Sequence, residues 1–150
     1  MKDKYFLDTN IFVYSFDPNE KIKNSIARDL IQNALKEQVG CISSQVIQEF
    51  LNVSTKKFNP PLAIEDSLKY LNTVLAPLCE IYTSVDLYRK TIETSERWKY
   101  SFYDSMVITA AIQTNCSILY SEDMQHDQNI QSLTIVNAFL SSVAVETPVT

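Results

Sequence analysis

Short apolar runs alternate along the chain with longer stretches that repeat apolar residues at helical spacing, and this alternation constrains the fold more than any other feature. The first run, Tyr5–Leu7, predicts a buried strand, and the stretch 21–36 has the apolar spacing of a helix. Strands that alternate with helices predict a mostly parallel sheet covered on both faces. We therefore expect a three-layer α/β/α sandwich, with strands at 5–7, 39–43, 80–83, 117–120 and 133–136.

Particular residues predict where the helices begin and end. Ser44 is expected to cap the helix that follows the second strand, and Pro60-Pro61 to end it. Pro77 is expected to stop the next helix, whose apolar stripe we expect to pack mostly in the core: Ile64, Leu68, Leu71 and Leu75. Another helix is expected over 84–99, and a last one after Asp104, which is apolar on nearly all sides and therefore buried.

The length and composition predict a single domain. The chain has 150 residues, 45% of them hydrophobic, and no linker or repeat interrupts the pattern. We expect a globular domain over residues 1–140 and a tail over 141–150. Three cysteines, far apart in sequence, favour reduced thiols and a cytoplasmic location. No apolar run approaches the roughly 18 to 20 residues of a membrane span, and a strand is expected at the N-terminus in place of a signal peptide.

Glycine and histidine are so scarce that several classes of enzyme are excluded. Gly40 is the only glycine, so the chain has no Walker loop, GxGxxG fingerprint or GxSxG nucleophile elbow, because each needs more than one. His126 is the only histidine, which excludes a multi-histidine zinc site. The hydrophilic neighbours of His126 predict an exposed loop residue and not a general base. Carboxylates remain as the abundant reactive groups.

Two aspartates follow predicted strands. Asp8 comes directly after the first strand, and Asp123 follows the strand at 117–120 by one short turn. Ligands of open α/β sheets bind beyond the carboxyl ends of the strands, so acids in these places are candidates for a site. The alternative is that each aspartate only caps the helix or turn behind it, as aspartate commonly does.

Two further acids lie on predicted helices. Glu49 shares a helix face with Val46 and Val53, so its charge needs a cation, a basic partner or an exposed helix edge. Asp104 begins the most apolar helix, where an interaction with the helix dipole is the alternative. If all four acids enter one crevice, they repel one another unless divalent ions bind, and Mg²⁺ and Mn²⁺ prefer hard oxygen ligands. The four acids therefore predict a metal site.

A metal site held by carboxylates suits the hydrolysis of phosphodiester bonds, which needs neither a histidine nor a glycine loop. The net charge of -5 argues against a basic nucleic-acid wrapper, but short basic segments can still hold a phosphate backbone, namely Lys56-Lys57, Arg89-Lys90 and Arg97-Trp98-Lys99. Arg97 and Lys99, just before the third acid, are our candidates for RNA phosphate contacts. The alternative for both is a solvated helix end.

Several short motifs occur in the order and spacing of a known family. They are Leu7-Asp8-Thr9-Asn10, Glu49, Tyr103-Asp104, Ser121-Glu122-Asp123 and Ile135-Val136-Asn137. Over about residues 4 to 140 this set resembles the PIN-domain ribonucleases, and in style the VapC-like toxins. The resemblance implies an α/β/α sandwich and an endoribonuclease that depends on Mg²⁺ or Mn²⁺, with one or two ions.

The resemblance also implies roles for individual residues. Asp8 and Asp104 would ligate the metal most directly, and Glu49 and Asp123 would complete or support the cluster. Three neighbouring residues would position these ligands by hydrogen bonds: Thr9, Asn10 and Ser121. The implied partners are an RNA substrate, a second copy in a homodimer, and a small antitoxin whose C-terminal segment enters the acidic groove, often with an arginine. The stripe between Ile64 and Leu75 could serve an interface.

Two residues depart from the family's pattern. Asp127 stands where the family often has glycine, and aspartate tolerates left-handed backbone better than most residues, so we expect the turn to survive with an added negative charge near the site. Glu122 lies beside Asp123 and leaves two candidates for the fourth ligand, of which Asp123 fits the motif better.

Two other functions stay open at this point. A phosphatase of the haloacid-dehalogenase type also starts from an aspartate after the first strand, but its pattern needs a second aspartate where Asn10 stands. A catalytically inactive PIN-like binding module would keep the fold and use the acids as caps. The enzyme and the inactive module differ in metal binding, which caps do not require.

Overall fold

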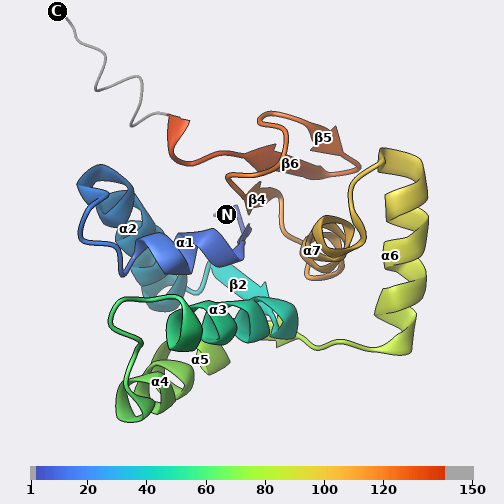
Figure 1. The fold of residues 1–150 in the computed structure, drawn as a ribbon. Coiled ribbons are helices and arrows are strands. Elements are labelled where there is room, and N and C mark those ends of the chain that lie inside the picture. The colour runs from blue at the N-terminus through green and yellow to red at the C-terminus, as the bar shows by residue number, and fades with distance from the viewer. Residues whose placement is uncertain (1–2, 141–150) are drawn as a thin grey trace, which may run out of the picture.

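The computed structural model describes residues 3–140 (Figure 1). Within them, a six-stranded sheet has the order β3-β2-β1-β4-β6-β5, and every pair is parallel except β5 with β6. Its strands are β1 (Tyr5–Leu7), β2 (Gly40–Ser43), β3 (Cys79–Ile81), β4 (Ile118–Tyr120), β5 (Asn129–Ile130) and β6 (Leu133–Val136). The predicted mostly parallel α/β fold is confirmed, whereas the predicted tail at 141–150 lies outside the described residues.

Helices connect these strands and cover the sheet. They are α1 (Thr9–Tyr14), α2 (Lys21–Glu37), α3 (Ser44–Lys56), α4 (Ile64–Tyr70), the π-helical turn η1 (Leu71–Leu75), α5 (Ala76–Leu78), α6 (Val85–Trp98) and α7 (Phe102–Gln113). Helices α1 to α5 group on one side of the molecule and α6 with α7 on the other (Figure 1). None of the helices within residues 3–140 combines the length and the apolar character needed to cross a membrane.

The order in which the chain adds strands to the sheet reverses at β1, which lies between β2 and β4. From β1 the chain proceeds outward through β2 to β3, and then returns to the opposite edge of β1 as β4. Tyr5 pairs with both Gly40 and Ile118, so β1 is central and buried. Ligands of such sheets bind where the strand order reverses, at the carboxyl ends of the strands. The fold therefore directs attention to the residues that follow β1 and β4.

Two predicted helix boundaries are wrong. Ser43, the last residue of β2, occupies the cap position of α3, and Ser44 is already helical. The Ser44 hydroxyl instead accepts a hydrogen bond from the backbone N–H of Thr83 at 3.0 Å. Pro77 does not stop the preceding helix, because it lies in the first turn of α5, where its missing N–H is unneeded.

The apolar stripe that was expected to lie mostly in the core is divided between core and surface. Leu75 is fully buried, whereas Ile64 is 79% exposed and Leu68 is 55% exposed. Only the end of the stripe nearest the sheet packs in the core. Helix α1 and the short strand β5 were not predicted from the sequence.

Left-handed backbone in this chain is carried by residues other than glycine. Within residues 3–140 these positions are Gln38, Lys99, Asn115, Asp127 and Gln131. The expectation that Asp127 accommodates a left-handed turn is thus met, with a φ of 66°. Gly40 serves packing instead: a Cβ there would lie 2.5 Å from the Ala34 Cβ and 2.9 Å from Tyr5 Cε1.

We predict that Gly40→Ala destabilises the protein. The added methyl would force apart β1, β2 and α2, and overpacking of this kind costs about 1–3 kcal/mol. Urea denaturation measures the change in the free energy of unfolding. Gln38→Gly is the matched control, because it removes a side chain from a left-handed residue two positions away and should not lower stability. Equal stability of Gly40→Ala and the parent protein would contradict the packing argument.

Candidate active site

A pocket of about 560 Å³ lies at the point where the strand order reverses. Its walls come from the segment after β1, from α3, from the start of α7 and from the turn after β4. All four predicted acids line it, together with two of the three predicted supporting residues: Asp8, Glu49, Asp104 and Asp123, with Thr9 and Asn10. The third supporting residue, Ser121, is buried beside the pocket and contacts Asp8.

Asp8 is the buried acid of the pocket. Its Oδ1 accepts a hydrogen bond from the backbone N–H of Thr9 at 2.7 Å, and its Oδ2 accepts one from the Ser121 hydroxyl at 2.9 Å. Burial raises the pKa of Asp8 to about 6; these two hydrogen bonds act in the opposite direction, and the charges of Glu49 and Asp104 add to the rise. Asp8 also caps α1. The capping that was the alternative to a place in the site is therefore present together with it.

Glu49 is half-buried on α3 and is held by neutral donors. The Thr9 hydroxyl donates to its Oε1 at 2.6 Å, and the Gln45 amide donates to its Oε2 at 3.2 Å. From the sequence, the charge of Glu49 was expected to need a cation, a basic partner or an exposed helix edge. Among the described residues it has no basic partner, and its side chain is only partly exposed. The carboxylate therefore keeps its negative charge directed at the pocket without a cationic partner among the described residues.

Asp104 lies in the first turn of α7, but it does not cap the helix. Ser101 is the cap, and its hydroxyl accepts a hydrogen bond from the Asp104 N–H at 3.2 Å. Burial raises the pKa of the Asp104 carboxyl, a hydrogen bond with Ser101 lowers it, and the charges of Asp123 and Glu49 raise it further. Because Ser101 supplies the cap, the Asp104 carboxylate is left for the pocket.

The two neighbouring acids after β4 have different surroundings. Asp123 is exposed and accepts a hydrogen bond from the Asn10 amide at 3.3 Å. Glu122 is ion-paired with Lys23 at 2.7 Å and accepts a hydrogen bond from the Tyr14 hydroxyl at 2.8 Å. Glu122 therefore has its charge compensated within the protein, whereas Asp123 has only a neutral donor.

Gln45 and Lys57 also line the pocket, outside the predicted set of ligands and supporting residues. Gln45 is buried one helical turn before Glu49, and its Oε1 is a buried atom without a hydrogen-bond partner in the described structure. Lys57, just beyond the end of α3, is the lysine among the lining residues. A glutamine on the apolar face of a helix was a usable signal for Gln45. Lys57 belongs to the basic segment Lys56-Lys57, which the sequence offered for contacts with a phosphate backbone, and the structure adds that it lines this pocket.

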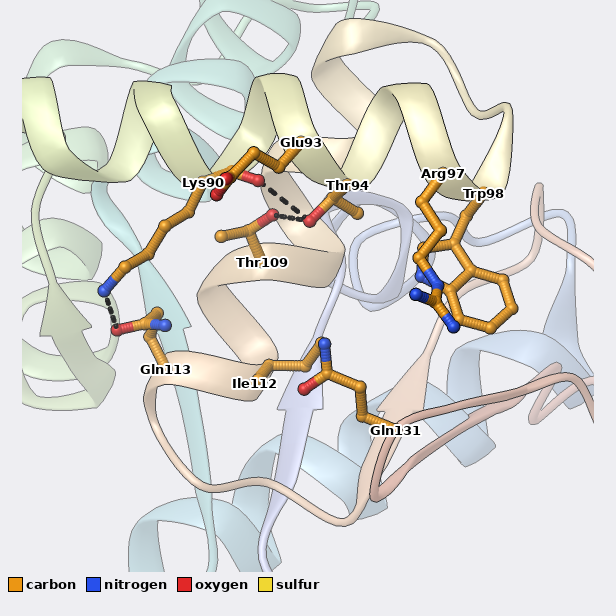
Figure 2. A pocket seen from close by; sticks show the side chains of 9 residues that line it. All are labelled: Lys90, Glu93, Thr94, Arg97, Trp98, Thr109, Ile112, Gln113 and Gln131. Atoms are coloured by element: carbon orange, nitrogen blue, oxygen red, sulfur yellow. Dashed lines mark hydrogen bonds between the residues drawn. The ribbon is translucent and has the colours of Figure 1, made fainter.

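The residues proposed for phosphate contacts lie elsewhere. Arg97 lines a separate pocket of about 210 Å³ between α6 and α7, with its guanidinium 5.2 Å from the centroid of the Trp98 ring (Figure 2). Lys99 forms an ion pair with Glu96 at 3.5 Å. Neither residue lines the carboxylate pocket, and neither does His126, whose Nδ1 accepts a hydrogen bond from the Asn137 N–H at 3.0 Å.

The chemistry of the donors in the pocket fits a hard divalent cation. The atoms of the pocket that could ligate a metal are carboxylate, amide and hydroxyl oxygens. Two of the amide oxygens, Asn10 Oδ1 and Gln45 Oε1, are buried without hydrogen-bond partners in the described structure. Burial is the main cause of the raised pKa values of Asp8 and Asp104, and the charges of neighbouring acids add to it. Within residues 3–140, however, no three acidic, histidine or cysteine side chains converge closely enough to form a ready-made metal cluster.

Solved structures with the same fold include components of toxin-antitoxin systems. One is a toxin-antitoxin complex from Klebsiella pneumoniae, with 15% identity, a TM-score of 0.66, and coverage of 90% of this chain and 98% of that chain. Another is VapC20 of Mycobacterium tuberculosis, described as a toxin that cleaves the sarcin-ricin loop, with 19% identity, a TM-score of 0.57 and coverage of 80% and 90%. At these identities the likeness establishes the fold alone.

A third solved structure is VapBC2 from Rickettsia felis bound to a DNA fragment from their promoter, with 20% identity, a TM-score of 0.54, and coverage of 87% of this chain and 96% of that chain. No curated protein matches the sequence. The family model of the PIN domain matches residues 5–129, which span the sheet up to β5 and include the four predicted acids of the pocket. The chain therefore belongs to the PIN-domain family.

Proposed function

We propose that this protein is a metal-dependent endoribonuclease that hydrolyses RNA phosphodiester bonds and acts as the toxin of a toxin-antitoxin pair. The observation that carries the proposal is the meeting of four uncompensated acids from distant parts of the chain in one pocket. Membership of the PIN-domain family supports it. One structural neighbour, VapC20 of Mycobacterium tuberculosis, is described as a toxin that cleaves the sarcin-ricin loop, and this supports the choice of RNA.

The proposed ligands of Mg²⁺ or Mn²⁺ are Asp8 and Asp104, with Glu49 and Asp123 completing the set. A bound ion of this kind supplies an activated water and stabilises charge on the phosphoryl oxygens. The protein's own residues fix the ligands: Ser121 and the Thr9 N–H hold Asp8. The Thr9 hydroxyl holds Glu49, so this one residue orients two acids of the pocket.

Asn10 orients the fourth proposed ligand. Its amide donates to Asp123, and its Oδ1 is the other atom of the pocket that is buried without a partner. Lys23 keeps Glu122 out of the proposed ligand set by neutralising it in an ion pair. These contacts support Asp123 as the ligand in preference to its neighbour.

The proposed partners are a small antitoxin and a second copy of the chain. A basic side chain of an antitoxin would be attracted by the uncompensated acids of the pocket. Two exposed apolar strips support protein contacts: Ile64 with Leu68 on α4, and Val85 with Ile92 on α6. We also propose a cytoplasmic location, in keeping with the three free cysteines, although the Cys41 and Cys116 sulfurs lie only 3.5 Å apart in the core.

We predict that the purified protein cleaves structured RNA with Mn²⁺ or Mg²⁺, that EDTA abolishes cleavage, and that Asp104→Asn lowers the rate by roughly 100-fold or more. The magnitude follows because even groups that only orient metal ligands contribute about 10- to 100-fold. Gel analysis of end-labelled RNA measures cleavage. Mn²⁺ should also raise the melting temperature of the parent protein but not of Asp104→Asn.

Ser84→Ala is the matched control for that variant, because it removes the cap of α6 at a residue that does not line the carboxylate pocket. It should lower the free energy of unfolding by about 1 kcal/mol and leave the response to Mn²⁺ intact. Cleavage that persists in EDTA, or that is equal in Asp104→Asn and the parent, would contradict the proposed function. Absence of both cleavage and Mn²⁺ binding would favour the inactive PIN-like module.

We predict that Asp123→Asn weakens Mn²⁺ binding by about 10-fold or more, whereas Glu122→Gln changes it by less than about 3-fold. The charge of Glu122 is already compensated by Lys23, and that of Asp123 is not. Isothermal titration with Mn²⁺ measures both variants. The reverse order of effects would assign the fourth ligand to Glu122.

We predict that Lys57→Ala weakens RNA binding and reduces the slope of log affinity against log salt by about one, because one phosphate contact is lost. Arg97→Ala with Lys99→Ala tests the contacts expected from the sequence. If those two residues hold RNA, the double variant should also weaken binding and flatten its salt dependence. Fluorescence anisotropy at several salt concentrations measures RNA binding by each variant. If a variant binds RNA as the parent protein does, the substituted residue does not contact RNA phosphate.

A further inference from the structure

A second pocket, of about 380 Å³, adjoins the carboxylate pocket and has a different chemistry. Aromatic side chains and uncharged polar groups line it, among them Gln45, Gln48, Thr83, Tyr88, Phe102 and Tyr103. No acidic or basic residue belongs to its wall. The ligand that fits such a wall is an uncharged, flat group with hydrogen-bonding edges.

The three rings form a connected and accessible surface. The ring centroids of Tyr88 and Phe102 are 6.3 Å apart, and those of Phe102 and Tyr103 are 5.7 Å apart. Tyr103 is 65% exposed, Tyr88 42% and Phe102 39%. Aromatic faces of this kind are the usual platforms on which the bases of single-stranded RNA stack.

The two pockets share a wall. Gln45 and Tyr103 line both of them, and Tyr103 directly precedes the proposed metal ligand Asp104. The Gln45 amide donates to the Tyr103 carbonyl at 3.2 Å and to Glu49 at 3.2 Å, so the shared wall is fixed by hydrogen bonds. A nucleotide whose phosphate lies at the acids has its neighbouring base within reach of the rings.

We propose that this second pocket, the aromatic pocket, binds a nucleobase next to the phosphate that is cleaved. The inference rests on the proposed ribonuclease function. Gln48, which is exposed on α3, and the buried Gln45 amide place hydrogen-bonding groups beside the rings, where the edge of a base would lie. The uncharged wall matches a base, whereas the acids next to it match the metal and phosphate.

The competing occupant is a second copy of this chain. Tyr88 lies on the same helix as the exposed residues Val85 and Ile92, so a dimer contact could extend over the rings. The amides in the wall and the continuity with the acids favour the base. The experiment below separates the two occupants.

The test compares two oligoribonucleotides of about 12 nucleotides, a length that a single-strand site accommodates, one with normal bases and one abasic throughout. Both carry the same phosphate charge, so their affinity ratio reports base contacts alone. Fluorescence anisotropy measures the ratio in a buffer with Ca²⁺ in place of Mg²⁺ or Mn²⁺. The length of the RNA is checked after each titration, so that binding is measured on uncleaved RNA. We expect the parent protein to prefer the normal RNA by roughly 5- to 150-fold, as stacking on one or more aromatic side chains provides.

Variants of Tyr103 locate the base contact. Tyr103→Leu should reduce the preference by at least about 5-fold and leave the affinity for abasic RNA unchanged, while Tyr103→Phe, which keeps the ring, should retain the preference. Tyr82→Leu is the control, because Tyr82 is equally exposed but lines neither pocket. The Gln45 hydrogen bond goes to the backbone of residue 103, so the substitutions leave it in place.

A preference that survives Tyr103→Leu, or that is absent in the parent protein, would overturn the proposal. A parent dimer that becomes a monomer in Tyr103→Leu by sedimentation, with RNA binding unchanged, would assign the rings to a contact between copies. The ratio is measured without cleavage, so its loss is distinguishable from failure of the ribonuclease function. RNA cleavage without base preference would reject the aromatic pocket alone, and base preference without cleavage would reject the nuclease alone.

Discussion

The hydrogen bond from Ser121 to Asp8 joins the end of β4 to the end of β1, and the arrangement of the candidate site depends on it. It holds a carboxylate that is buried and whose pKa is raised by that burial. Burying a carboxylate without a cationic partner is costly, and hydrogen bonds offset only part of that cost. The fold thus keeps a negative charge in a place where it favours the binding of a positive one.

The other acids are held in the same way, by neutral donors that orient them without cancelling their charge. Thr9, Gln45 and Asn10 supply hydroxyl or amide hydrogens to Glu49 and Asp123. The exception is Glu122, which Lys23 neutralises at the edge of the pocket. Charge is therefore retained where the proposed metal is needed and removed one residue away, a distinction that depends on the three-dimensional position of α2.

Patterns local in sequence predicted much of the fold and of the site. The strands at β1, β4 and β6, and the acids that follow β1 and β4, were visible because apolar runs and strand ends are local features. The acid on α3 and the one that begins α7 also reached the expected pocket. The basic pair Lys56-Lys57 was visible in the sequence, but the position of Lys57 in the wall of the acidic pocket depends on how α3 packs. The ion pair of Lys23 with Glu122 could not be predicted, because it depends on how α2 packs. Arg97 and Lys99 lie outside the carboxylate pocket, and their contact with RNA stays a prediction.

The register of β1 with β4 joins Tyr5 to Ile118, across most of the described chain. The first acid of the pocket, Asp8, follows β1, and the last one, Asp123, follows β4, so most of the described chain lies between them. Contacts of such long sequence separation form only after the intervening chain is available. During translation the pocket therefore cannot assemble until the ribosome has released residues beyond Asp123. A nascent chain of this topology therefore lacks the assembled acidic pocket until most of the domain has been synthesised.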